Sequence, residues 1–163
     1  MERLKSIAAA RTFHCPRYAE LPEMNLYLEQ VLLLVNTALE PVQSEPLTGA
    51  MVSNYIKNKA IPAPIKKKYT RDHMAYLMVT CLMKQVFTVQ QITRLFEIQQ
   101  GTYPLQVAYD FFCSEYENAL RGAFEFTGEA LPCIETARTD QTVLVRSMVL
   151  AAANRVYVEK SFF

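Results

Sequence analysis

The sequence has no tryptophan, only four glycines and only two histidines. His14 and His73 are far apart, and neither has a second metal ligand at the spacing that a metal site requires. The chain also has no glycine-rich phosphate loop, no nucleophile elbow and no pair of carboxylates arranged for acid–base catalysis. We therefore expect no enzyme, no catalytic residue, no cofactor and no metal. His73, in the first turn of a helix, is expected to be a surface or DNA-proximal side chain rather than a catalyst.

Long apolar runs and paired cysteines are missing as well. No run reaches the roughly 18 residues that a membrane span requires, and the apolar stretch before Arg11 is too short for a signal peptide. The four cysteines never form a Cys-x-x-Cys motif, which favours buried free thiols over disulfides or zinc ligands. They are Cys15, Cys81, Cys113 and Cys133. We expect a cytoplasmic protein with no membrane partner.

Charge is nearly balanced over the whole chain but unevenly distributed. The 163 residues include 17 basic and 16 acidic side chains, a net charge of +1. Residues 54–94 hold eight basic residues and one acid, Asp72, a net charge of +7, so the remainder carries −6. A basic module on an acidic remainder is expected when one surface meets nucleic acid.

Apolar side chains recur at helical spacing along most of the chain, and no convincing strand pattern occurs. The predicted fold class is therefore all-α. Residues 1–22 have weak periodicity and are expected to form a partly packed arm, held through Phe13 and Tyr18. The helix over 22–39 would bury a stripe that includes Met24. Helices are predicted at 22–39, 48–58, 70–85, 88–98, 103–126 and 140–160, with Thr48, Thr70, Thr88 and Asp140 as N-terminal caps and a break at 99–102.

The helix over 48–58 has two different faces. Val52, Tyr55 and Ile56 share the face that must pack inward. The opposite face is small or hydrogen-bonding and has no acid, so it can enter a major groove, where Asn pairs with adenine and Lys with guanine or phosphate. An ordinary solvated face explains the same pattern equally well. The residues of this outer face are Ala50, Ser53, Asn54, Lys57 and Asn58.

A proline-containing bend follows this helix. Each of Pro62 and Pro64 holds the residue before it in extended geometry, so residues 60–64 cannot be helical. Lys66, Lys67 and Lys68 then project from a short loop, which forms at most a tiny two-stranded wing over 63–69. Clustered lysines suit phosphate and carry no base information. Such a run is usually a solvated loop, but here it lies beside a candidate recognition helix.

Three blocks of sequence resemble the start of a MerR-type winged helix-turn-helix regulator: residues 52–64, residues 69–74 and the opening Phe-Thr-Val-Gln-Gln-Ile at 87–92. Residues 20–97 resemble more closely an uncharacterised bacterial family, a domain of unknown function, found mainly in Gram-positive species and itself MerR-like. The sequence departs from the MerR pattern where Ser53-Asn54 replaces an Arg-Tyr pair, where Lys59 replaces glycine, and in its very short wing. The expected DNA-binding residues are Ser53, Asn54, Lys57, Asn58, Lys66, Lys67, Lys68, Tyr69 (a phosphate or packing contact) and Arg71.

These features predict an arm over 1–22, a MerR-like domain over 23–98 and a helical extension over 103–163 for dimerisation, partner binding or ligand binding. The leading hypothesis is a homodimeric transcription regulator that binds double-stranded DNA, with no effector indicated. One alternative is a protein-interaction module of helix-turn-helix shape with an acidic protein partner. The other is a ligand-sensing domain, although its aromatic residues fit a core or a dimer interface more simply. The aromatic residues in question are Tyr109, Phe111, Phe112, Tyr116, Phe124 and Phe126.

Overall fold

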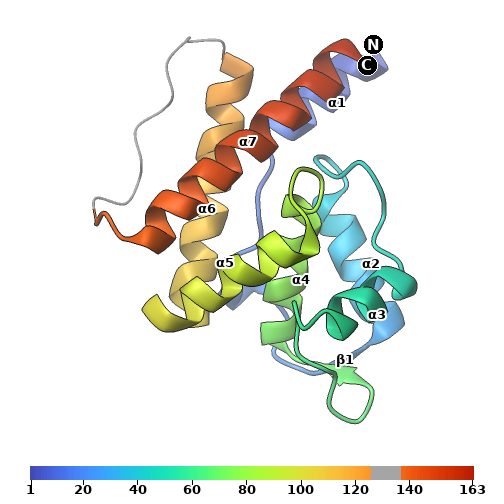
Figure 1. The fold of residues 1–163 in the computed structure, drawn as a ribbon. Helices are drawn as coiled ribbons and strands as arrows, with labels where there is room; N and C mark the ends of the chain where they lie inside the picture. The colour runs from blue at the N-terminus through green and yellow to red at the C-terminus, as the bar shows by residue number, and fades with distance from the viewer. Residues whose placement is uncertain (126–136) are drawn as a thin grey trace.

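The structure, a computed structural model, describes residues 1–125 and 137–163. These residues form helices and one two-stranded antiparallel sheet, which confirms the expected all-α class (Figure 1). The elements are α1 (Glu2–Arg11), the 3₁₀ helix η1 (Tyr18–Glu20), β1 (Leu26–Tyr27), α2 (Leu28–Leu39), α3 (Gly49–Lys57), β2 (Lys68–Tyr69), α4 (Arg71–Met83), α5 (Val89–Thr102), α6 (Leu105–Glu125) and α7 (Asp140–Phe162).

Helix α4 is the centre of the fold. The Thr70 hydroxyl accepts a hydrogen bond from the His73 N–H and caps its first turn, and every residue from His73 to Met83 is buried. A helix that is apolar all round needs neighbours on every side. Helices α2, α5, α6 and α7 supply them (Figure 1).

The longest two helices, α6 and α7, cross each other, and α1 lies along the C-terminal half of α7 (Figure 1). Arg3 Nε donates to the Lys160 carbonyl oxygen at 3.4 Å, and the two chain ends lie side by side. The sequence did not predict α1, because its hydrophobic pattern is weak and Ala10 is its only buried residue. Its position depends on α6 and α7 rather than on a local signal.

The segment after α1 is packed, as expected. Phe13 is buried and meets the ring of Tyr116 edge-on, with ring centroids 5.9 Å apart. The Tyr18 N–H donates to Asp110 at 2.8 Å. Arg17 donates two hydrogen bonds to the Glu117 carboxylate, at 2.7 and 2.9 Å. The first residues are therefore fastened to α6 rather than detached from it.

The first predicted helix begins later than expected. Residues up to Tyr27 are not part of it, and Met24, expected in the core, is 71% exposed. Leu26 is extended because it pairs with Tyr69 across the sheet. Helix α2 then begins at Leu28, and the Gln30 side chain accepts from the Tyr27 N–H at 2.9 Å. Pairing with a distant strand overrode the local preference of proline and acid for a helix start.

Two other predicted boundaries are corrected. The expected break at 99–102 lies inside α5. The helix ends at Thr102, and its C-terminal cap, Tyr103, is extended because Pro104 follows. The cap of α7 is Thr139, whose hydroxyl accepts from the Thr142 N–H, while Asp140 begins the first turn. Thr48, Thr70 and Thr88 are caps as predicted. The expected loop over 128–139, with Cys133, lies mostly outside the described residues.

The three cysteines that the structure describes, Cys15, Cys81 and Cys113, are buried free thiols, as expected. Tyr109, Phe112 and Tyr116 belong to the core. Phe111 and Phe124 are partly buried against it, and Phe126 lies outside the described residues. Within the described ranges, no helix combines the length and apolar character that crossing a membrane requires.

Candidate nucleic-acid interface

Helix α3 presents the polar face that its sequence predicts. Val52 and Tyr55 are buried, whereas Ser53, Asn54 and Lys57 are exposed. Asn58, at the C-terminal cap, is also exposed. Its amide nitrogen donates to the carbonyl oxygen of Asn54 at 2.8 Å and to the side-chain oxygen of Asn54 at 3.0 Å. The two asparagines therefore form one hydrogen-bonded pair on the outer face.

The end of α3 is closed by a Schellman motif. The Ala60 N–H donates to the Tyr55 carbonyl and the Lys59 N–H to the Ile56 carbonyl, at 2.9 and 3.0 Å. Lys59 has φ 58°, the left-handed conformation that this motif needs and that glycine usually supplies. The backbone here has the conformation that glycine usually supplies at this point, but the position carries an exposed positive charge.

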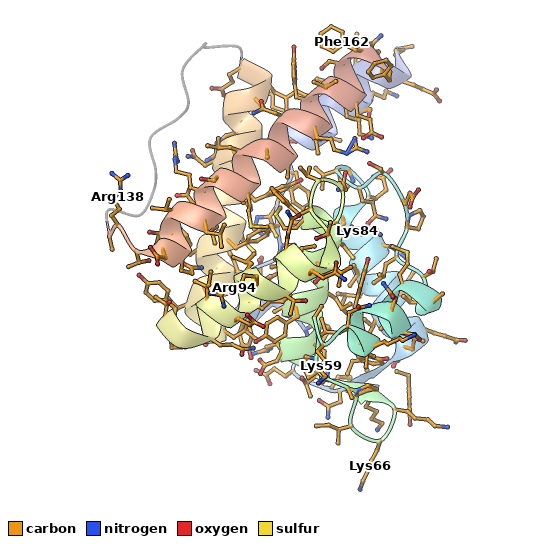
Figure 2. The ribbon with its side chains drawn as sticks, viewed as in Figure 1. Lys59, Lys66, Lys84, Arg94, Arg138 and Phe162 are labelled. Carbon is orange, nitrogen blue, oxygen red and sulfur yellow. The ribbon has the colours of Figure 1, made fainter. Side chains whose placement is uncertain are left out.

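Residues 65–68 form a two-residue hairpin, which we name the lysine hairpin. Ile65 and Lys68 exchange two backbone hydrogen bonds, at 3.0 and 2.9 Å. Between them, Lys66 has φ 50° and Lys67 has φ 64°. Positive φ at both central residues is the signature of a type I′ turn, in which Asn and Gly are preferred. Figure 2 shows Lys66 at the tip, pointing away from the body of the molecule.

The wing predicted over 63–69 is therefore present in part. Within that range the structure has only the single bridge between Ile65 and Lys68. The named sheet instead pairs β2 with β1, joining Leu26 to Tyr69 and Tyr27 to Lys68. The prediction missed β1 because a two-residue strand has too few positions to show an alternating pattern.

His73 holds the base of the lysine hairpin and is not at the surface, contrary to expectation. It is 3% exposed; its Nδ1 accepts from the Thr70 N–H at 3.0 Å, so Nε2 donates to the Ala63 carbonyl oxygen at 3.1 Å. Tyr69 is 5% exposed and meets the His73 ring edge-on. Of the two roles expected for Tyr69, the structure shows packing.

Two of the predicted DNA-binding side chains, Lys68 and Arg71, make contacts within the fold. The Lys68 ammonium lies 5.1 Å from the centre of the Tyr27 ring. The Arg71 guanidinium donates to the Leu21 carbonyl at 3.1 Å and approaches Glu23 at 3.5 Å. Both side chains are only half-buried, but these contacts fix their direction. They fasten the N-terminal segment to β2 and α4.

Three other charged residues of the basic segment 54–94, Lys84, Arg94 and Asp72, also have contacts within the fold. Lys84 lies against the Met51 sulfur at 3.6 Å, and Arg94 is paired with Glu97 at 3.0 Å. The only acid of the segment, Asp72, accepts a hydrogen bond from the Tyr18 hydroxyl. Burial, and then this hydrogen bond, raise the pKa of Tyr18 to about 12.

Four exposed lysines remain, and no ion pair joins any of them to an acid among residues 1–125 and 137–163. We name them the interface lysines. Two come from the last turn and the end of α3, and two from the tip of the lysine hairpin, on the side of the molecule away from the chain ends (Figure 2). They are Lys57, Lys59, Lys66 and Lys67.

The predicted DNA-binding residues therefore fall into two groups, one exposed and one in contact with other parts of the fold. Ser53, Asn54, Lys57 and Asn58 share one exposed surface on α3, and Lys66 and Lys67 project beyond the fold on the hairpin that follows. Tyr69, Lys68 and Arg71 make contacts within the fold instead. Lys59 was not predicted as a site residue, although the sequence places this lysine where the MerR pattern has glycine. Among the described residues, no cluster of three or more His, Cys, Asp or Glu side chains could hold a metal ion.

A family model described as a domain of unknown function, DUF1836, matches residues 16–112. No curated protein and no solved structure matches the chain. The matched region begins in the segment fastened to α6, includes the sheet, α2 to α5 and the interface lysines, and ends inside α6. Because this match spans more than half of the chain, the protein belongs to the DUF1836 family.

Proposed function

We propose that this protein is a DNA-binding transcription regulator of the cytoplasm, built on a winged helix-turn-helix plan similar to that of MerR proteins. Helix α3 would enter the major groove and the lysine hairpin would contact phosphates as a minimal wing. The observation that carries the proposal is the set of four exposed interface lysines, at the C-terminal end of α3 and on the hairpin that follows it, together with the polar face of α3.

The proposed roles of these residues, phosphate contact or base contact, follow from their chemistry. Lysines at the hairpin tip are mobile point charges that suit phosphate oxygens, whatever the base sequence. Asn54 can pair with the edge of an adenine. The outer face of α3 carries no arginine for bidentate contact with guanine. Phosphate binding is therefore expected to contribute more affinity than base recognition.

A homodimer would place two such surfaces on one duplex. Helix α7 is the proposed contact between two copies, because Val143, Val158 and Phe162 are 44%, 45% and 62% exposed on it. A symmetric pair of α3 helices reads half-sites about one helical turn apart.

Selection from a random duplex library tests this proposal. Purified protein should enrich a motif, and a symmetric motif would report a dimer. Asn54→Ala should relax one base preference, whereas Lys67→Ala should weaken binding to all duplexes alike. Lys5→Gln, on α1, is the matched control that removes a distant exposed charge. Failure to bind any duplex at low salt would exclude the proposal.

A second candidate function is binding to an acidic protein. The Asn54–Asn58 pair supports it, because the Asn58 amide donates to the side-chain oxygen of Asn54, the acceptor that pairing with adenine would need. A complex that forms through the interface lysines and persists in excess duplex DNA would favour this candidate.

A further inference from the structure

Helix α7 has an outward face without charged side chains between Val143 and Val158. The opposite face of the helix, with Val145, Val149 and Ala152, is buried in the core (Figure 1). Along the outward face the side chains are apolar, small or uncharged polar, and each is exposed or partly exposed. They are Val143, Ser147, Leu150, Ala151, Asn154 and Val158.

The two arginines beside this outward face are bound within their own chain. Arg146 Nη1 donates to the Glu115 carboxylate at 3.3 Å. Arg155 Nε donates to the Gln85 carbonyl oxygen at 3.0 Å. Their positions in the helical turn place them on opposite edges of the face. A helix face that meets only water usually carries charged residues, so this one is better suited to contact with another protein surface.

The residue types on this face follow nearly the same order in both directions. Val143 and Val158 are at its two ends, and Ser147 and Asn154 come next. The midpoint of each pair is the same, between the central residues Leu150 and Ala151. A contact between two identical copies about a two-fold axis requires a surface that is complementary to itself. The outward face of α7 has this property when two copies of the helix run in opposite directions.

We propose that two copies of this chain pair through the outward faces of α7, antiparallel, with the two-fold axis between Leu150 and Ala151. Val143 would then pack against the partner's Val158. The Ser147 hydroxyl donates to the Val143 carbonyl oxygen at 2.9 Å, so its own oxygen can accept from the amide of the partner's Asn154. This inference rests on the homodimer of the proposed function and specifies which faces meet and in which direction.

Charge substitutions at the two valines test the direction of pairing. Val143 and Val158 are 44% and 45% exposed and lie about 22 Å apart along the helix, so charges placed there cannot meet within one chain. Val143→Glu and Val158→Lys should each weaken dimerisation about tenfold, because a charge then faces a valine of the partner. An acid near the start of a helix and a lysine near its end suit the helix dipole, so both variants should fold.

The double variant Val143→Glu, Val158→Lys is the decisive one. In the antiparallel pair each new carboxylate meets the partner's new ammonium group, so dimerisation should return to within about threefold of the wild type. In a parallel pair the new charges would face charges of the same sign, and dimerisation would weaken further. Leu33→Glu, at a residue 71% exposed on α2, is the control and should leave dimerisation unchanged.

Sedimentation velocity of the full chain over a series of concentrations, without DNA, measures these effects, and circular dichroism checks folding. One helix face from each copy makes a small interface, so we expect a micromolar dissociation constant. A wild type that stays monomeric at millimolar concentration, or folded single variants that dimerise as the wild type does, would overturn the inference. So would a double variant that dimerises no more tightly than the single variants. Duplex binding by a chain with any of these results would remove the α7 contact and leave the proposed role of α3 intact.

Discussion

Among the described residues other than glycine, all those with a positive φ are lysines. They are Lys59, Lys66 and Lys67. A residue with a β-carbon is disfavoured there by about 1 kcal/mol or more. Glycine at the end of α3, and Asn-Gly in the hairpin turn, would be more stable. Placing three positive charges at these points lowers stability locally, a pattern that is common at functional surfaces.

The first prediction separates stability from binding. The double substitution Lys66→Asn, Lys67→Gly should raise the free energy of unfolding by about 1 kcal/mol, because both residues then suit a type I′ turn. The same variant should bind duplex DNA at least tenfold more weakly. Chemical denaturation and fluorescence anisotropy measure the two effects.

The control for this double variant is Lys66→Gln, Lys67→Gln, which removes the two charges and keeps the strained turn. That variant should lose affinity without gaining stability. Unchanged DNA affinity in both double variants would contradict the assignment of the hairpin.

Glu117 carries a second residue-scale prediction. Burial would raise the pKa of this carboxyl, but hydrogen bonds from Arg17 and from the Cys15 N–H outweigh burial and hold its pKa below the ordinary value. Its contribution to stability is therefore present above the unfolded pKa, about 4.3, and is lost as pH falls through the lower folded pKa. Glu117→Gln should lower the free energy of unfolding at pH 7 by about 2 kcal/mol.

The measurement is the free energy of unfolding as a function of pH. The difference between wild type and Glu117→Gln should shrink as pH falls below about 4.3. A constant difference across this range would show that the carboxylate charge does not stabilise the N-terminal segment.

At the scale of elements, the parts of the fold with local signals were predictable. Thr48, Thr70 and Thr88 cap their helices as the sequence predicts, and α4 is buried throughout its length from His73. Helix α1 and strand β1 were not predictable, because the first lacks an apolar stripe and the second has two residues. Both depend on partners distant in sequence.

At the candidate site, too, only the features with a local sequence signal were predictable. The exposed face of α3 and the lysine run could be predicted, since both are local. The contacts of Arg71 with Leu21 and of Lys68 with Tyr27 could not, because these partners come from the N-terminal segment. The burial of His73 could not be predicted either, because it depends on the hydrogen bond between its Nε2 and the Ala63 carbonyl oxygen.

The pairing of α6 with α7 includes a buried carboxylate and gives an element-scale prediction. Glu115 is 1% exposed, and Arg146 on α7 approaches it at 3.3 Å. Arg146→Met should destabilise the protein by about 3 kcal/mol, because it removes a positive partner from a buried negative charge. Adding Glu115→Gln should recover at least half of that loss.

Thermal or chemical unfolding of the two single variants and the double variant measures this coupling. Strictly additive effects would indicate that the two side chains do not stabilise each other across the helix pair.

At the scale of the whole molecule, the interface lysines lie apart from the acids that hold the N-terminal segment and α7 against α6. Glu117 and Asp110 bind the N-terminal segment to α6, and Glu115 lies between α6 and α7. The interface lysines project from the end of α3 and the hairpin tip, on the other side of α4 (Figure 2). A near-neutral chain can in this way present a local positive surface, which the net charge of +1 conceals.

The DUF1836 match ends at residue 112, inside α6, yet the core continues beyond it. Tyr116 and Leu120 on α6, and Val145 and Val149 on α7, belong to the same buried cluster as α4. The C-terminal helices thus complete the core of the family region.

The most direct test of the central claim is the salt dependence of duplex affinity in the wild type and in a variant with Lys57, Lys59, Lys66 and Lys67 all changed to Gln. Each phosphate contact contributes a slope of about 0.9 in log affinity against log salt. We predict that the fourfold variant has a slope shallower by about 3.6, whereas Lys5→Gln matches the wild type. Equal slopes in the wild type and the fourfold variant, or no duplex binding by the wild type at low salt, would contradict the account.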